Sequence, residues 1–201
     1  MLNRERAHYL RRIARYGFGP GGMGWEPSGK TMNIRFEILS EIFRWGSTPW
    51  HLIDVGCGVG HFLSWLGAFN GTWRGIDRLP EMIDAARARH PHSQFQVCDV
   101  RDYKGPRADF VVASGAFNLG SERHLRGCVE AMWRLARKGV AFNALSTWAP
   151  AAKIKREGPT IKFFDPLKTL AFCRSLAPLV SLRHDYLRGE DFTIYLRRRP
   201  G

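Results

Sequence analysis

The sequence lacks paired cysteines, long apolar runs and internal repeats, and each absence narrows the possible class of protein. The four cysteines are Cys57, Cys98, Cys128 and Cys173. None belongs to a C-x-x-C pair, so we predict neither a disulfide framework nor a structural zinc site. No apolar stretch approaches the roughly 20 residues that span a bilayer, and the amino-terminal residues lack the apolar segment of a secretory signal. We therefore expect a soluble, cytoplasmic protein with no membrane partner.

Acidic residues are few, because 18 Asp and Glu stand against 31 Lys and Arg, for a formal net charge of +13. A basic surface attracts the phosphates of nucleic acids and other anions. The arginines are spread along the chain, however, and do not form one dense block with interleaved aromatic residues. We therefore favour a small-molecule substrate and keep nucleic acid as an alternative, while the sequence leaves the oligomeric state open.

The most informative segment is HLIDVGCGVGH, residues 51–61, which indicates a buried strand followed by a glycine-rich turn. Glycines at 56, 58 and 60 let the backbone turn sharply and let a ligand lie against main chain. Seventeen residues after Gly60, a second apolar strand ends in Asp77, where a carboxylate can accept hydrogen bonds from both hydroxyls of a ribose. The spacing is G-x-G-x-G, tighter than the G-x-G-x-x-G of dinucleotide-binding folds.

The segment from Asp54 to Gly60 resembles the first motif of the class I S-adenosylmethionine-dependent methyltransferases, D-x-G-x-G-x-G. The resemblance continues through residues 75–86, similar to the second motif, and through FQVCDV at 95–100, similar to the third. It covers roughly Arg35 to Arg197. It implies S-adenosyl-L-methionine as cofactor, with S-adenosyl-L-homocysteine as product, and a Rossmann-like fold.

The resemblance also implies a set of cofactor-binding residues near the strand ends. They are Arg35, Asp54, Gly56, Cys57, Gly58, Gly60, Asp77, Arg78, Met82, Asp99, Val100, Ser114 and Gly115. Within this set, Asp54 and the glycine turn would bind the amino group of the methionine portion and Arg35 its carboxylate. Leu79 and Met82 would flank the adenine. Alternatives stay open, because Arg35 could be a helix-surface arginine, Met82 a core residue and Asp99 a cap for the segment after it.

Apolar strands that alternate with amphipathic helices predict a doubly wound α/β fold with helices on both faces of the sheet. The family resemblance implies seven strands, mostly parallel, with an antiparallel strand in a terminal hairpin. We expect strands at Leu52–Val55, Trp73–Asp77, Gln94–Cys98, Phe110–Ser114, Val140–Leu145, Leu179–Leu187 and Phe192–Leu196. We expect helices at about Arg4–Tyr16, Lys30–Phe43, Phe62–Ala68, Pro80–Arg89 and Glu122–Ala136, and one that begins at Pro166 after the N-cap Asp165.

No linker rich in Pro, Gly or Ser divides the interior, so we predict one domain over residues 1–201. Residues 1–48 would form an N-terminal helical extension, with a possible lid at the glycine loop 17–24 and Trp25. Residues 49–147 would form the cofactor-binding core. Residues 148–201 would provide a substrate-side connection, a helix and the terminal hairpin.

Three residues are candidates for catalytic work, although the sequence does not identify a general base. They are His61, Asn118 and His184. A helix N-terminus would lower the pKa of His61 and keep it neutral, and Asn118 follows the fourth strand, where substrates bind in such sheets. Turn and strand roles remain the structural alternatives for these residues.

The motifs narrow the chemistry. The chain has no [N/D]-P-P-[Y/F] after the fourth strand and no Pro-Cys pair there, which disfavours the amino-methylating DNA and protein enzymes and the cytosine-C5 enzymes. Acids for a metal site are not evident, so we predict no metal. Our first hypothesis is methyl transfer to an oxygen or nitrogen of a small molecule. The alternatives are an RNA methyltransferase with a basic surface and a cofactor-binding protein without turnover.

Overall fold

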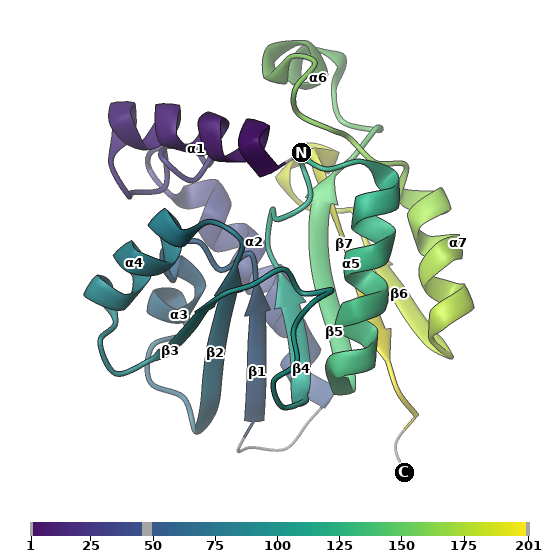
Figure 1. Cartoon of the computed structure of the whole chain (residues 1–201). Coiled ribbons are helices and arrows are strands. Elements are labelled where there is room, and N and C mark those ends of the chain that lie inside the picture. The colour runs from purple at the N-terminus through teal and green to yellow at the C-terminus, as the bar shows by residue number, and fades with distance from the viewer. Residues whose placement is uncertain (1, 46–49, 200–201) are drawn as a thin grey trace.

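The computed structural model describes residues 2–45 and 50–199, and a seven-stranded sheet forms its centre (Figure 1). The strands are β1 (Trp50–Val55), β2 (Gly71–Asp77), β3 (Gln94–Val97), β4 (Ala108–Ala113), β5 (Ala136–Leu145), β6 (Leu179–Arg183) and β7 (Asp191–Arg197). Their order is β3-β2-β1-β4-β5-β7-β6, and only β7 runs antiparallel to its neighbours. The predicted Rossmann-like sheet with an antiparallel terminal strand is therefore confirmed.

Helices cover both faces of the sheet, as predicted (Figure 1). On one face lie α2 (Lys30–Ser40), α3 (His61–Leu66) and α4 (Pro80–Arg89); on the other lie α5 (Glu122–Leu135) and α7 (Pro166–Leu176). The remaining helices, α1 (Leu2–Tyr16) and α6 (Ala151–Glu157), lie beyond the carboxyl ends of the parallel strands. In the parts of the chain that the structure describes, no helix has the length and apolar character of a membrane span.

Caps in the sequence explain where the helices on the second face begin. Ser121 accepts a hydrogen bond from the backbone of His124 and starts α5, while Asp165 accepts from the backbone of Leu167 and starts α7. Pro166 occupies the first turn of α7, where a missing N–H costs nothing. The predicted start of α7 is thus confirmed.

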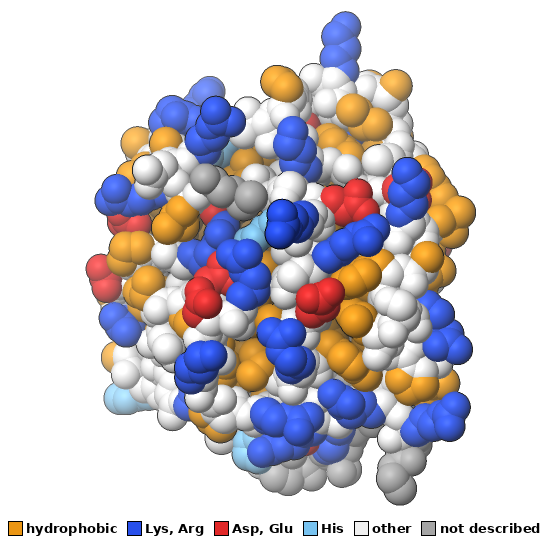
Figure 2. All heavy atoms as spheres, turned by 45° about the vertical axis from the view of Figure 1, so that its right-hand side comes forward, with side chains coloured by type: hydrophobic (Ala, Val, Ile, Leu, Met, Phe, Trp, Pro, Cys, Tyr) orange, Lys and Arg blue, Asp and Glu red, His pale blue; other side chains and the backbone are white. Residues whose placement is uncertain are grey.

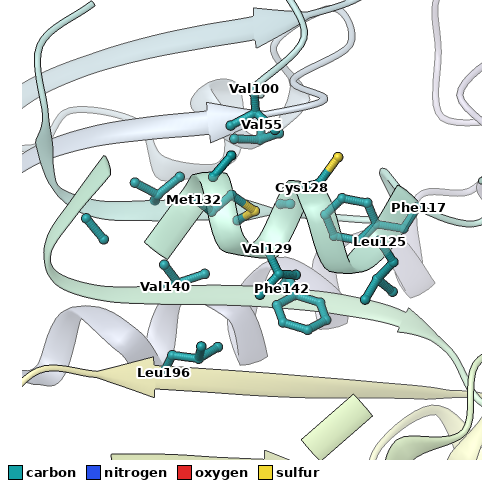
Figure 3. Packing of buried hydrophobic residues seen from close by; sticks show 14 of the residues in the cluster. Val55, Val100, Phe117, Leu125, Cys128, Val129, Met132, Val140, Phe142 and Leu196 are labelled. Carbon is teal, nitrogen blue, oxygen red and sulfur yellow. The ribbon is translucent and has the colours of Figure 1, made fainter. Parts of the chain in front are cut away.

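The core holds the sheet against α5, whose apolar side chains point to β5 and β1 (Figure 3). Met132, Val129 and Phe142 are completely buried there. Full burial of such a side chain contributes about 1.5–3 kcal/mol, so this face fixes the strand ends that carry the site. A second buried cluster packs α2, α3 and α4 on the opposite face.

The structure corrects three predicted elements. The helix expected over Lys30–Phe43 is α-helical only to Ser40 and continues as a 3₁₀ turn, Glu41–Trp45. The glycine after this turn, Gly46, is the residue that the sequence indicates as the end of the helix, and it lies outside the described residues. The strand expected over Leu179–Leu187 ends at Arg183, so His184 follows the strand. The connection after Trp148 contains α6, which the alanines and lysines after Pro150 favour.

Candidate functional site

The glycine-rich turn between β1 and α3 has the conformation that its sequence requires. Gly56, Gly58 and Gly60 have φ of 68°, 53° and 80°, in the left-handed region that side chains disfavour. A Cβ at Gly56 would lie 2.6 Å from the Cβ of Ala116, in the loop after β4. A Cβ at Gly60 would lie 2.8 Å from the ring of His90. The turn therefore exposes bare main chain where β1 and β4 end side by side.

Asp77, at the end of β2, faces this turn. Its carboxylate accepts hydrogen bonds from the backbone N–H of Gly58 at 3.0 Å and of Leu79 at 2.9 Å. Burial raises the pKa of Asp77, while these two hydrogen bonds and the charge of Arg78 oppose the rise. The acid and the turn predicted to act together are thus in direct contact.

Asp54, the last acid of β1, is 2% exposed, and its Oδ2 atom has no hydrogen-bond partner in the structure. Burial, followed by the negative charge of Asp77, raises the pKa of Asp54 well above its usual range. A buried acceptor without a donor is costly, and a cationic ligand group at this position would satisfy it.

These residues line a cavity, here called the first cavity, at the carboxyl ends of β1, β2 and β4. Most of the predicted cofactor-binding residues line it, namely Asp54, Gly56, Cys57, Gly58, Asp77, Arg78, Met82, Asp99, Val100, Ser114 and Gly115. Leu79 and the candidate His61 line it as well. Arg35, Gly60, Asn118 and His184 do not.

Ser114 and Gly115 are held in the wall of the first cavity by Asn143 of β5. The Asn143 side chain donates to Ser114 Oγ at 3.1 Å and accepts from the Gly115 N–H at 2.7 Å. Asn143 is completely buried. It therefore fixes the loop after β4 without lining the cavity itself.

Asp99 lies between two arginines. Its carboxylate accepts from Arg101 Nε at 2.9 Å and pairs with Arg78 at 3.6 Å. Burial alone would raise the pKa of Asp99, but the hydrogen bonds and charge of Arg101, with the charge of Arg78, lower it to about 2. It also accepts from the backbone N–H of Arg101, so the expected capping contact is present in a residue that also lines the first cavity.

Helix α1 and the loop 17–25, together called the cover, contribute Glu5, Tyr9, Met23 and Trp25 to the lining of the first cavity. Helix α1 lies above the carboxyl ends of the parallel strands in Figure 1. Glu5 of α1 forms an ion pair with Arg78, and Arg6 forms one with Glu81 of α4. Tyr9 of α1 and Met23 of the loop pack against a small cluster formed by Val59, Leu79 and Met82. These contacts place the cover directly on the predicted cofactor-binding residues.

Arg35 lies elsewhere than the sequence suggested. Its guanidinium donates to both carboxylate oxygens of Asp191, at 2.8 and 2.5 Å, and it is 4% exposed. The same guanidinium lies over the ring of Trp25, 4.8 Å from the centroid. The ring in turn packs on Gly115, where a Cβ would lie 2.5 Å from it. Arg35 therefore holds the aromatic residue of the cover against the end of β4.

A second cavity lies beside the first, lined by α1, the loop residues 23–26, α6 and the ends of β4 and β5. The two cavities share four lining residues, Tyr9, Met23, Trp25 and Gly115. The second cavity carries charges of both signs, from Arg12, Arg35, Lys153, Arg156, Glu26, Glu157 and Glu190, and His8 lines it as well. A ligand in the first cavity would thus meet a polar ligand in the second across this shared wall.

The three catalytic candidates lie in different places relative to the two cavities. His61 lines the first cavity, and burial, with the charges of Arg89 and His90, lowers its pKa to about 4. Asn118 lines the second cavity, and its Oδ1 accepts from the Leu145 N–H at 3.3 Å. His184 lines neither cavity and bonds Ser146 Oγ at 2.7 Å.

Sequence reasoning missed several residues of the first cavity. They are Glu5, Tyr9, Phe36, His124 and Cys128, whereas Met23 and Trp25 belong to the loop that the sequence indicated as a possible lid. Burial and the charges of Arg78 and Arg101 lower the pKa of His124 to about 4, and Asp99 partly opposes this. His124 and Cys128 are four residues apart on the buried face of α5, so the amphipathic pattern of that helix was the available signal. In the described parts of the chain, no group of three or more His, Cys, Asp or Glu could hold a metal ion.

A family model described as a methyltransferase domain matches residues 52–139. A curated protein of Mycobacterium tuberculosis, Rv1506c, whose name proposes methyltransferase activity, is 32% identical over 163 residues, which cover 75% of this chain and 94% of that protein.

Two solved structures have the same fold at low sequence identity. Magnesium protoporphyrin IX methyltransferase from Synechocystis PCC 6803, with bound S-adenosylhomocysteine, has a TM-score of 0.76 at 12% identity and covers 98% of this chain and 100% of that one. CalS10, an amino pentose methyltransferase from Micromonospora echinaspora with bound S-adenosylmethionine, has a TM-score of 0.65 at 18% identity and covers 82% and 90%.

Proposed function

The chain belongs to the class I S-adenosylmethionine-dependent methyltransferases, and we propose that it methylates an oxygen or nitrogen of a small polar molecule bound in the second cavity. The observation that supports this proposal is the wall that the two cavities share at Tyr9, Met23, Trp25 and Gly115. Because these residues line both cavities, the cavities adjoin there, and an acceptor atom in the second cavity can approach a methyl carbon held in the first.

The first cavity suits the cofactor at its ammonium group, its ribose and its adenine. The unpartnered Oδ2 of Asp54 would accept from the ammonium of the methionine portion, and Asp77, beside the glycine turn, would accept from the ribose hydroxyls. Met82 and Val100 supply apolar surface, and Asp99 an acceptor, for the adenine. Bound S-adenosylmethionine would supply an electrophilic methyl carbon on a cationic sulfur.

The protein contributes orientation and exclusion of water. Trp25 lines both cavities. Its ring packs against the guanidinium of Arg35, which donates two hydrogen bonds to Asp191. A wall fixed in this way aligns acceptor and methyl carbon, and alignment supplies much of the rate in group transfer. The cover then shields the reacting atoms from solvent.

A hydroxyl or ammonium acceptor must also lose a proton. His8 of α1 lines the second cavity, and burial, with the charges of Arg12 and Arg11, lowers its pKa. It is therefore neutral at physiological pH and able to accept that proton. His61 borders the first cavity and His184 borders neither cavity, so both are less suited to this role.

The charges in the second cavity favour a small polar acceptor over RNA. Glu26, Glu157 and Glu190 line it among the basic residues, and Lys153 is paired with both Glu157 and Glu190, at 2.9 and 3.2 Å. Carboxylates beside the reaction centre would repel a phosphate backbone. The alternative of a binding protein without turnover has less support, because the two cavities adjoin.

Calorimetry with S-adenosylhomocysteine tests the cofactor assignment. We expect Asp77→Ala to weaken binding at least about tenfold, because an ionised acceptor of two hydroxyls is lost. The control is Asp84→Ala on the outer face of α4, where the side chain is 74% exposed. Equal affinities for wild type and Asp77→Ala would overturn the placement of the cofactor.

Transfer of a radiolabelled methyl group tests the acceptor class. We expect label to appear in the low-molecular-weight fraction of a metabolite extract and to be absent from RNA of the same cells. Label in RNA alone would replace the small-molecule proposal with the RNA alternative. Tight binding of S-adenosylhomocysteine without labelling of either fraction would support the binding protein instead.

A further inference from the structure

A hollow with strong positive charge lies at the amino ends of the parallel strands, the edge of the sheet opposite the first cavity. Arg74 of β2, Arg107 before β4 and Arg137 of β5 line it, together with His51 of β1. Among residues 2–45 and 50–199, no Asp or Glu lines this hollow. Three guanidinium groups therefore share one concave surface without a carboxylate in its wall.

Neutral acceptors hold Arg74 in place. Its Nε donates to Gln94 Oε1 at 3.0 Å, and another guanidinium nitrogen donates to the Tyr103 hydroxyl at 2.5 Å. Neither partner is ionised, so these bonds orient the guanidinium and leave its charge uncompensated. Such fixed orientation reduces the entropy that binding would otherwise cost.

Arg107 and Arg198 converge on the same backbone oxygen. Arg107 donates to the carbonyl of Ala136 at 3.0 Å, and Arg198 Nε donates to the same atom at 3.0 Å. Burial lowers the pKa of Arg198, and the positive charge of Arg107 lowers it further. Arg198 is also braced by the ring of Trp133, 4.2 Å from the centroid. The fold thus keeps two like charges together at the rim of the hollow.

Asp109 of β4 follows Ala108 of the hollow in the chain, and its charge is already compensated. It pairs with Lys138 at 3.4 Å and accepts from the backbone N–H of His51 at 3.0 Å. Asp109 is also buried, 8% exposed. Figure 2 shows the same lower edge of the molecule with Lys and Arg side chains gathered along it and little acidic surface between them.

We propose that this hollow binds a phosphate group, carried by a free phosphate, a phosphorylated small molecule or a nucleic-acid backbone. Guanidinium groups bind phosphate oxygens in paired, charge-assisted hydrogen bonds. A phosphate dianion carries more negative charge than a single carboxylate, so it balances the charge of several fixed cations better. The site lies at the far edge of the sheet from both cavities, so it is distinct from the methyl-transfer site. A phosphate site would therefore account for part of the excess of arginines, which the transfer reaction does not need.

Titration with inorganic phosphate, against sodium chloride at matched ionic strength, tests the proposal by backbone amide NMR. We expect shifts confined to residues 51–53, 72–74, 106–108 and 136–138. We expect Arg107→Gln to weaken phosphate binding about tenfold, because it removes a charge-assisted contact. Arg107 is an exposed loop residue, so the variant should fold. Arg137→Gln provides a second variant with the same expected direction.

Arg126→Gln is the matched control, because it removes the same charge from the outer face of α5, where Arg126 pairs with Glu122. Equal weakening by Arg107→Gln and Arg126→Gln, or shifts spread over all arginine-rich surfaces, would overturn the site. A mononucleotide and a ten-nucleotide RNA form the second arm. If the RNA binds more tightly than the mononucleotide and Arg107→Gln removes this difference in affinity, the phosphate belongs to a nucleic acid. If the RNA and the mononucleotide bind with equal affinity, the phosphate belongs to a small ligand.

Discussion

The floor and the cover of the first cavity are built by different kinds of interaction. The floor consists of the glycine turn, Asp54 and Asp77 at the ends of buried strands, and the backbone N–H groups of Gly58 and Leu79 donate hydrogen bonds to the Asp77 carboxylate. Within residues 2–16 no side chain of α1 is buried, and its ion pair between Arg6 and Glu81 is largely exposed. Exposed ion pairs contribute only about 0–1 kcal/mol each. Affinity should therefore come from the floor, while the cover controls access.

The strongest test of the floor is Gly56→Val. The variant places a branched side chain at φ 68° and against Ala116, so we expect binding of S-adenosylhomocysteine to fall about a hundredfold or more. Calorimetry measures this. The control is Gly67→Val, which has a similar φ of 63° but no atom within 4 Å of the new Cβ. Comparable losses in both variants would show that backbone strain, rather than the shape of the floor, determines affinity.

Beside the floor, His124 of α5 lines the same cavity and should make stability depend on pH. Its folded pKa of about 4 lies below the ordinary 6.5, so its neutral form stabilises the fold above pH 6.5, and that stability is lost as the pH falls toward 4. Between pH 7 and 5 we expect the free energy of unfolding to drop by about 2 kcal/mol on this account.

Chemical denaturation of His124→Gln checks this expectation, because the variant should lose less stability over the same pH range. His92→Gln, at an exposed histidine, should behave like wild type. A wild-type pH dependence in His124→Gln would mean that another group carries the effect.

Trp25 lies where the floor and the cover meet, and we expect Trp25→Ala to reduce the rate of methyl transfer more than the affinity for the cofactor. We expect kcat/KM for the acceptor to fall about tenfold, since alignment at the shared wall is lost, with a change in S-adenosylhomocysteine affinity of about threefold at most. Steady-state kinetics and calorimetry measure the two effects. Trp148→Ala, at a half-exposed tryptophan outside both cavities, is the control. Loss of cofactor affinity equal to the loss of kcat/KM would assign Trp25 to the floor.

The smallest expected effect belongs to the cover alone. Glu5→Gln removes the ion pair with Arg78, and we expect S-adenosylhomocysteine to dissociate about threefold faster, with a weaker dependence on salt than in wild type. Stopped-flow fluorescence measures dissociation. The control is Glu122→Gln, which removes a more exposed ion pair from α5. An effect of Glu5→Gln as large as that of Gly56→Val would refute the division between floor and cover.

The same division explains how much of the site was predictable from sequence. The floor is encoded locally, because the turn at 56–60 and Asp77 follow strands whose carboxyl ends must meet. The cover depends on contacts such as the one between Glu5 and Arg78, 73 residues apart. No local sequence pattern indicates such a pair, so the contacts of Glu5 and Tyr9 with the cavity were missed even though α1 itself was predicted.

Arg35 shows the same limit for a residue that the sequence did single out. Its predicted role at the cofactor carboxylate rested on its place before β1, but its partner Asp191 is 156 residues further along the chain. Similarly, the strand expected over Leu179–Leu187 ends at Arg183, and Leu187 and Arg188 adopt positive φ of 47° and 56° in the turn that follows. Neither residue type favours that conformation, so the turn and the position of His184 could not be derived from propensity.

The pair between Arg35 and Asp191 has a consequence for the order in which the enzyme becomes competent. Asp191 opens β7, which lies between β5 and β6 in the sheet and follows the glycine turn and Asp77 far along the chain. A nascent chain that has not yet reached this strand already has the glycine turn and Asp77, but it lacks the carboxylate that holds Arg35 against Trp25. The residues that would bind the cofactor are therefore synthesised before the residue that fixes the wall between the two cavities.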